Sequence, residues 1–399
     1  MDLPGFFLRA ILSTLGLLAS LLILAGQGYW ALVGYRFAGS RFRAPHARAA
    51  ALMLLAVLYL ALVFLMNQAL GHPGYGPKQN STRLGLADVG RAFAYWWLIA
   101  STVAFIIALP IRMLTRVTLQ PQPGRRHFLE HCATGIIAAP FAATGYAILR
   151  GRVELEVIRT RAPIARLPAQ FSGFRIVQLS DIHISPFMEA WQIREFAEVA
   201  NSLRPNMIVL TGDFVCWDPT VVGEVVGALS GLHAPFGVFA CLGNHEAWTG
   251  AKDSITSSFE RAGVNVLRDS RRRIAVDGSA INLIGIEPHY GWGTKQVPGG
   301  LTVPDTPNIL LSHYPDVFDH AASVGIDLTL SGHTHGGQVK LNYVTPHLLP
   351  SKAELPYLAG WFERPGGRLY VNRGIGTIFV PIRFGMTPEI TVFELSRVG

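Results

Sequence analysis

Long apolar runs dominate the first 150 residues, and polar residues gather in the stretches between them. A helix needs about 20 residues to cross a hydrocarbon core of about 30 Å, so the first three runs predict transmembrane helices. The fourth is shorter and contains Pro140, so it predicts either a span completed by its flanks or a helix in the membrane interface. Residues 1–150 are expected to form a transmembrane anchor of about four helices. The runs lie at residues 6–32, 49–70, 93–113 and 132–149.

After residue 150 the pattern changes to short strands that alternate with helices. Residues 153–157 alternate apolar and charged positions with the period of 2 that is typical of a strand. Alternation of strands and helices of this size predicts an α/β domain over residues 151–399. Helices are expected at residues 189–203 and 221–232. Further strands are expected at residues 175–180, 207–211, 237–241, 274–276, 281–286, 309–312, 328–331, 369–372 and 390–394.

Composition and charge agree with a membrane-bound first half. Half of the residues are hydrophobic and only 15% are charged, against about 25% in a typical soluble domain. Residues 1–170 contain 17 Lys and Arg against 5 Asp and Glu, a net charge of +12, whereas residues 171–399 contain 17 against 21, a net charge of −4. The basic excess lies between apolar runs, which favours the lipid bilayer as a partner and argues against nucleic acid.

The arginines leave the membrane orientation nearly balanced. If the basic loops at residues 36–48 and 112–126 lie in the cytoplasm, the C-terminal domain lies outside, and the sequon at Asn80 fits that arrangement. Basic residues at 78–91 and 150–161 favour the reverse. We expect a multi-pass protein of the cell membrane and favour the extracytoplasmic side for the C-terminal domain.

Side chains that can bind metal follow five of the predicted strands, each directly after the strand ends. In open α/β sheets, sites form beyond the carboxyl ends of the strands. A single strand-end Asp is often only a helix N-cap, and a single His is often an ordinary buried residue. Five such positions in order predict a metal site instead. They are Asp181 with His183, Asp213, Asn244 with His245 and Glu246, His313, and His333 with His335.

These residue types suit the hydrolysis of a phosphoester. Two cations about 3.5–4 Å apart can bind the phosphate oxygens and acidify a water between them. Asp, His and Asn ligands suit two divalent ions such as Mn, Fe or Zn. Asp213 is best placed to reach both ions, and Asn244 supplies a neutral oxygen. Cys216 and Cys241 adjoin these motifs but form no CxxC pair, so we expect small buried side chains rather than ligands.

The five motifs resemble those of the calcineurin-like metallophosphoesterase superfamily, whose pattern is DxH, GD, GNH(D/E), H and GHxH. All five blocks occur in order over about residues 174–336. The C-terminal stretch VNRGIGTIFVPIRFGMTPEI also resembles the membrane-associated, YkuE-like branch. The resemblance covers roughly residues 150–399 and implies an α/β sandwich with metals at the carboxyl ends of the strands.

The resemblance also implies roles for individual residues. His245 would face the scissile phosphate as a transition-state stabiliser or general acid. Glu246 stands where many members have Asp, and it would either orient His245 or act as a charge at a helix N-terminus. Asp213 would bridge both ions. The remaining ligands would be Asp181, His183 and His335 for the first metal, and Asn244, His313 and His333 for the second.

The sequence therefore predicts a membrane-anchored, metal-dependent enzyme that hydrolyses phosphoester or pyrophosphate bonds. Its partner would be a phosphoester substrate, and tethering to the membrane favours a lipid-linked one. A general or protein phosphatase whose anchor only localises it is the alternative within the enzyme class. A non-catalytic membrane scaffold with structural metals is disfavoured, because structural zinc sites are usually closed and rich in Cys.

Overall fold

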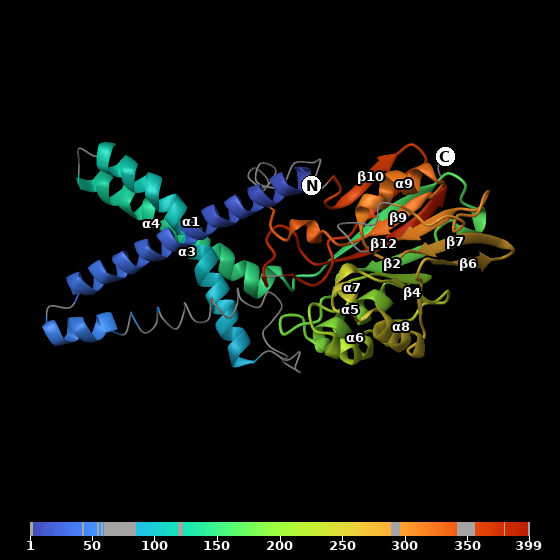
Figure 1. The fold of residues 1–399 in the computed structure, drawn as a ribbon, viewed down its shortest axis with the longest axis horizontal. Helices are drawn as coiled ribbons and strands as arrows, with labels where there is room; N and C mark the ends of the chain where they lie inside the picture. Colours follow the sequence, from blue (N-terminus) through green and yellow to red (C-terminus); the bar gives the residue numbers. More distant parts are fainter. Residues whose placement is uncertain are drawn as a thin grey trace. The chain divides into compact units, whose positions relative to one another are not determined.

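The computed structural model describes residues 3–41, 44–53, 56, 59, 85–118, 123–288, 296–340, 356–378 and 380–397. These residues divide into two compact units (Figure 1). The first consists of the described parts of Met1–His72 and Val89–Ile148, and the second of those of Pro73–Asp88 and Leu149–Gly399. Most of the predicted span at residues 49–70 and the sequon at Asn80 lie outside the described residues.

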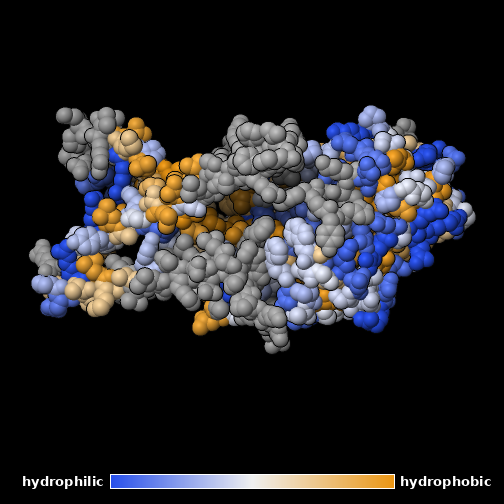
Figure 2. Space-filling model, in the orientation of Figure 1, coloured by the Kyte–Doolittle hydropathy of each residue, from blue (hydrophilic) through white to orange (hydrophobic). Residues whose placement is uncertain are grey.

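The first unit is helical. Its long helices are α1 (Leu3–Arg41), α3 (Leu86–Thr118) and α4 (Pro123–Tyr146), which the π-helical turn Ala147–Gly151 extends. Among the described residues, two helices are long and apolar enough to cross a membrane, Asp88–Leu114 and His127–Gly151. The shorter apolar run that contains Pro140 therefore reaches spanning length with its flanks. Hydrophobic residues cover much of the visible surface of this unit, whereas hydrophilic residues dominate the second (Figure 2).

Hydrogen bonds donated by side chains join α1 to α3. Gln27 Nε2 donates to Ser101 Oγ over 2.9 Å, and Trp97 Nε1 donates to Gln27 Oε1 over 2.9 Å. Trp30 Nε1 donates to the Ser101 carbonyl oxygen over 2.8 Å. An unpaired polar group costs several kcal/mol in hydrocarbon. These hydrogen bonds avoid that cost for the polar atoms where the two helices meet.

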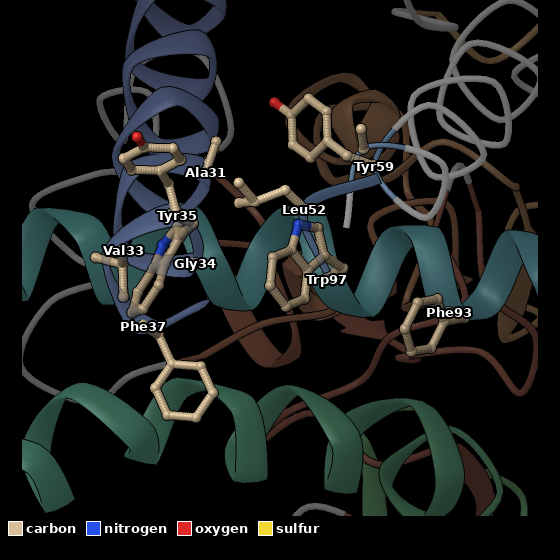
Figure 3. Close-up of a pocket in the computed structure, with 11 residues that line it drawn as sticks. Ala31, Val33, Gly34, Tyr35, Phe37, Leu52, Tyr59, Phe93 and Trp97 are labelled. Atoms are coloured by element: carbon tan, nitrogen blue, oxygen red, sulfur yellow. The ribbon is translucent and has the colours of Figure 1, made fainter. Parts of the chain in front are cut away.

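An apolar cavity of about 830 Å³ opens beside these helices (Figure 3). Its walls come from α1, from Leu52, Ala56 and Tyr59, and from α3. Because aromatic and aliphatic side chains line it, this cavity suits hydrocarbon better than a charged group. The lining includes Trp30, Val33, Phe37, Leu52, Phe93 and Trp97.

The described residues of the second unit form two six-stranded sheets. The first sheet has the order β1 (Glu156–Ile164), β12 (Glu389–Arg397), β2 (Arg175–Leu179), β3 (Met207–Thr211), β4 (Val238–Cys241) and β5 (Val264–Val266). The second has the order β10 (Gly360–Arg364), β11 (Gly367–Val371), β9 (Leu328–Ser331), β8 (Asn308–Leu311), β7 (Ser279–Gly285) and β6 (Ser270–Val276).

Helices cover the outer faces, so the unit has four layers (Figure 1). The first sheet packs against α5 (Ala190–Ser202), α6 (Val222–Leu229) and α8 (Lys252–Arg261), and the second against α9 (Phe318–Ser323). Between the sheets, Ile176 and Val209 of one pack with Leu283 and Ile309 of the other. Near-continuous apolar strands are expected where both faces of a parallel sheet are buried. The predicted α/β sandwich is confirmed.

The strand predicted at residues 153–157 begins later and runs further. The amides of Val153 and Glu154 donate to the Arg150 carbonyl, which closes the helical turn and delays the strand. β1 then starts at Glu156 and pairs in parallel with β12 along its whole length, from Glu156 opposite Glu389 to Ile164 opposite Arg397. β1 is therefore an integral edge strand of the first sheet.

Candidate metal centre

The strands that carry the motifs run parallel within each sheet, so their carboxyl ends meet at one edge. β2, β3 and β4 are neighbours in the first sheet, and β8 and β9 are neighbours in the second. The short helix α7 (Asn244–Trp248) begins three residues after the end of β4. The structure thus brings together the eight predicted site residues, namely Asp181, His183, Asp213, Asn244, His245, His313, His333 and His335.

Asp181, His183 and His335 form the first group. One ligand atom from each lies within 4.8 Å of those of the other two, and all three residues are buried. The Nε2 atoms of His183 and His335 are 3.1 Å apart, and His335 Nε2 lies 3.4 Å from Asp181 Oδ1. The residues expected to hold the first metal are therefore neighbours in space.

The second group surrounds Asp213. His313 and His333 join it within the same 4.8 Å limit. His313 Nε2 lies 2.9 Å from Asn244 Oδ1 and 3.2 Å from His333 Nδ1. Asp213 Oδ2 lies 3.1 Å from His313 Nε2 and also 3.5 Å from His183 Nε2 of the first group. This carboxylate thus stands between the two groups.

The donor atoms fit divalent cations. Imidazole nitrogens with carboxylate and amide oxygens are the ligand types that Mn, Fe and Zn accept. Where His183 faces His335, two ring nitrogens approach each other in a buried place, and a cation between them would satisfy both lone pairs. His245 Nε2 is also buried and has no hydrogen-bond partner among the described residues. Such an orphaned polar atom is expected where a ligand or substrate completes the site.

Electrostatics keep most of these imidazoles in the neutral form that can bind a metal. Burial lowers the pKa of His183 to about 3, and burial likewise lowers the pKa of His333 to about 3. Burial opposes ionisation of Asp213, but the nearby imidazoles of His313, His245 and His183 together outweigh it and hold the pKa of Asp213 well below its usual range. The pKa of His313 rises to about 9 despite burial, because Asp213 lies against it. Burial raises the pKa of Asp181 to about 6.

Five of the candidate ligands adopt an unusual backbone conformation. Positive φ is uncommon for residues other than Gly, and such strain concentrates at functional sites. The strain holds each side chain in a direction that an ordinary strand or helix would not give. The five residues and their φ angles are Asp181 (51°), His183 (46°), Asp213 (56°), His333 (73°) and His335 (52°).

The glycines within the motifs allow the loops to approach each other closely. A Cβ atom on Gly212 would lie 2.6 Å from the Gly243 amide nitrogen, and Gly212 itself has a φ of 87°. A Cβ on Gly243 would collide with the Asp213 carboxylate, and one on Gly332 with Ser180 and Asp181. Glycine at these positions therefore permits the convergence of the strand ends.

Glu246 binds backbone rather than the His245 side chain. Its Oε1 accepts hydrogen bonds from the amides of Phe214 (2.8 Å) and Val215 (3.1 Å), and its Oε2 accepts from those of Asp213 (3.0 Å) and Gly243 (2.8 Å). Of the two roles considered from the sequence, the structure fits the charge at a helix N-terminus, because Glu246 lies in the first turn of α7. It also ties the loop of Asp213 to the loop of Asn244.

His245 is held by other groups. Its Nδ1 lies against the Cys216 carbonyl oxygen, so Nδ1 carries the proton and Nε2 faces the site. The rings of Trp217 and Trp248 contact the imidazole, a feature that the sequence reasoning missed. The Cys216 sulfur lies near His183 and His245, but burial raises the pKa of this thiol well above its usual value, which disfavours the thiolate needed for metal binding.

Two arginines of the C-terminal stretch brace the site. Arg383 is fully buried and donates to the backbone carbonyls of Gly376, Met386 and Arg373, and one of its nitrogens lies 3.2 Å from His335 Nδ1. Arg373 pairs with Glu389 and Glu156. Neither arginine was predicted as a site residue, and the apolar neighbours Ile382 and Phe384 give no sign in the sequence that Arg383 contacts the site.

Comparison with known proteins agrees with this site. The family model described as calcineurin-like phosphoesterase matches residues 174–337. The protein named "Uncharacterized metallophosphoesterase YkuE" of Bacillus subtilis is 31% identical over 288 residues, which cover 69% of this chain and 99% of that protein.

Two further relatives have names that state an activity or a membrane location. The UDP-2,3-diacylglucosamine pyrophosphatase LpxG of Chlamydia trachomatis is 31% identical over 320 residues, covering 65% of this chain and 95% of that protein. A "Transmembrane protein with metallophosphoesterase domain" of Bos taurus is 30% identical over 258 residues, covering 60% of this chain and 57% of that protein.

A two-sheet α/β sandwich with clustered His, Asp and Asn at its strand ends defines a metallophosphoesterase, a hydrolase that uses divalent metals. The chain belongs to the calcineurin-like metallophosphoesterase superfamily, in its YkuE-like branch. This confirms the family and the enzyme class predicted from the sequence. The apolar helices and the transmembrane-named relative indicate association with a membrane.

Proposed function

We propose that this protein is a multi-pass membrane phosphoesterase with a two-metal catalytic centre that hydrolyses a phosphoester or pyrophosphate bond of a lipid-linked substrate. The catalytic domain comprises residues 151–399, and residues 1–150 anchor it. Asp181, His183 and His335 hold one ion, Asp213 bridges, and Asn244, His313 and His333 hold the other.

The position of Asp213 is the observation that carries this proposal. Its Oδ2 lies 3.1 Å from His313 Nε2 and 3.5 Å from His183 Nε2, so one carboxylate reaches a member of each group. Its other oxygen accepts the His245 amide over 2.9 Å, which fixes the side chain. A single carboxylate shared by two clusters of candidate ligands is the arrangement that a two-metal site requires.

The protein groups divide the remaining work. When bound, two divalent cations would supply Lewis acidity and neutralise charge on the phosphate. His245 presents Nε2 toward the phosphate, because its Nδ1 is engaged by the Cys216 carbonyl. His245 would then donate a proton to the leaving oxygen or stabilise developing charge. Glu246 and Arg383 orient the backbone and do not touch the substrate.

The lipid-linked substrate is supported by the apolar helices and by the pyrophosphatase activity that the name of the chlamydial relative states. Tethering raises the effective concentration of an enzyme toward a substrate in the same bilayer. We place the catalytic domain on the extracytoplasmic side, which the basic loops at residues 36–48 and 112–126 favour.

The test compares Asp213→Asn with the wild-type full chain in detergent. Asn keeps the size of the side chain but removes the bridging charge, so bound metal measured by elemental analysis should fall and hydrolysis of a soluble diester should disappear. Asp305→Asn, at an exposed loop position with positive φ, is the matched control and should retain both. Full activity and metal content in Asp213→Asn would reject the bridge.

The substrate class is tested with the wild-type protein. Lipid-linked pyrophosphates, phosphodiesters, phosphomonoesters and a phosphopeptide are compared by kcat/KM. Preference for the lipid-linked pyrophosphate supports the proposal. Preference for the phosphopeptide would instead make this protein a phosphatase whose anchor serves localisation.

A further inference from the structure

A pair of tryptophan rings borders the candidate metal centre beside His245. Trp217 lies in the loop after Asp213, and Trp248 ends α7, which begins with Asn244. The two ring centroids are 6.0 Å apart and the ring planes differ by 14°, so the rings are nearly parallel. Because both rings come from segments that carry candidate metal ligands, the backbone fixes their position relative to the metal centre.

His245 lies between this ring pair and the ligands. Its ring centroid is 4.7 Å from Trp217, 4.9 Å from Trp248 and 4.7 Å from His183. One imidazole ring thus separates the tryptophans from the metal centre. The Nε2 atom of His245 is buried without a hydrogen-bond partner among the described residues, which marks this side of the centre as the place where substrate is received.

The outer ring of the pair remains accessible. The Trp248 side chain is 52% exposed. Burial of a Trp side chain usually removes about 150–250 Å² of surface from water, so much of that area is left available here. Single exposed apolar residues are common. Trp248 differs because it stacks on Trp217 and packs on His245, three residues away on the same helix face. A held, flat and accessible ring next to a phosphate site is suited to stack a planar group of the substrate.

We propose that Trp217 and Trp248 form a stacking platform for a planar aromatic ring carried by the substrate, so that the substrate class is a nucleoside phosphate or nucleoside diphosphate ester. The phosphate lies at the metal centre, and the base lies on Trp248. This assignment rests on the proposed function, because it requires phosphate to bind at that centre. It adds a specificity determinant that acts on the substrate's base and leaves the chemistry of the phosphate unchanged.

Two inhibitors that differ only in the base test the platform. Adenosine 5′-monophosphate and ribose 5-phosphate are compared as competitive inhibitors of diester hydrolysis by the full chain. Stacking of one base predicts a Ki for adenosine 5′-monophosphate that is roughly 10- to 100-fold lower. Trp248→Ala should bring this ratio close to 1 and leave the Ki of ribose 5-phosphate unchanged, and Trp248→Phe should restore part of the ratio.

Trp191→Ala is the matched control. Trp191 lies on α5, outside the loop and the helix α7 that supply the ring pair, and is 48% exposed, close to the value for Trp248. This variant should keep the wild-type ratio. If the two inhibitors have equal Ki values in the wild type, the platform is rejected. If that protein still hydrolyses the diester, the proposed function remains supported. A loss of affinity for both inhibitors in Trp248→Ala would show that Trp248 only positions His245. Absence of both inhibition and hydrolysis in the wild type would overturn both proposals.

Discussion

Glu246→Gln offers a sharp test of how the site is assembled. The Glu246 side chain is fully buried, and its two oxygens accept four backbone amides from the loops of Asp213 and Gly243. Burial raises the pKa of Glu246, with a further contribution from Asp213, but only the ionised carboxylate can accept at all four positions. Gln keeps one acceptor oxygen and turns the other into a donor.

The magnitude follows from this change. Two of the four amides lose their acceptor and face an NH2 group in a buried place. Each unsatisfied buried donor costs about 1–3 kcal/mol, so the substitution should destabilise the domain by about 2–6 kcal/mol. For a domain of about 250 residues this corresponds to a fall in Tm of roughly 5–20 °C. Glu246→Asp keeps both acceptors on a shorter stem, so its loss should be smaller.

The assay is thermal unfolding of the full chain in detergent, together with metal content measured by elemental analysis. Glu224→Gln, at an exposed position of α6, is the control and should change stability by less than about 0.5 kcal/mol. If Glu246→Gln melts within about 2 °C of the wild type and binds metal normally, the four amide contacts do not hold the two loops together, and our account of Glu246 is wrong.

Two further predictions concern catalysis and folding. His245→Ala should lower kcat by about 10²–10⁴ and leave both metals bound, because Nε2 faces the site as a proton donor and not as a ligand; half-occupancy by elemental analysis would make His245 a ligand. A chain that starts at Arg150 should fold and should hydrolyse a soluble diester as well as the full chain does. It should hydrolyse a lipid-linked pyrophosphate in vesicles less efficiently than the full chain. A chain that starts at residue 170 lacks β1 and should melt at a lower temperature; equal Tm values for the two shortened chains would show that pairing with β12 adds nothing.

The parts of the fold that sequence predicts well are those with strong local patterns. The strands β2, β3, β8 and β9 are short, buried and mostly apolar, and each is followed by a polar motif, so their type and position can be predicted from local sequence. The edges of the sheets were harder to predict. β5 (Val264–Val266) is only three residues long, and β10 (Gly360–Arg364) is half exposed, so neither shows an apolar run.

The candidate ligands could be picked out from the sequence because chemistry restricts them to a few residue types in a fixed order. The groups around them could not. The burial of Arg383 depends on carbonyls that lie up to ten residues away along the chain. The stacking of Trp217 on Trp248 joins the loop after β3 to α7, and α6 and β4 lie between them in the sequence. Contacts of this kind arise only after folding and leave no local pattern.

The pairing of β1 with β12 has a consequence for how the enzyme could ever leave the membrane. The apolar helix ends at Gly151 and β1 begins at Glu156, so residues 152–155 are the whole connection, and Arg152 donates a hydrogen bond to the Phe187 carbonyl. A protease that released the domain would have to cut within this segment, because any later cut removes a strand from the sheet. Release of the catalytic domain in a separate, active form is therefore disfavoured, and the domain is expected to stay attached to its apolar helices.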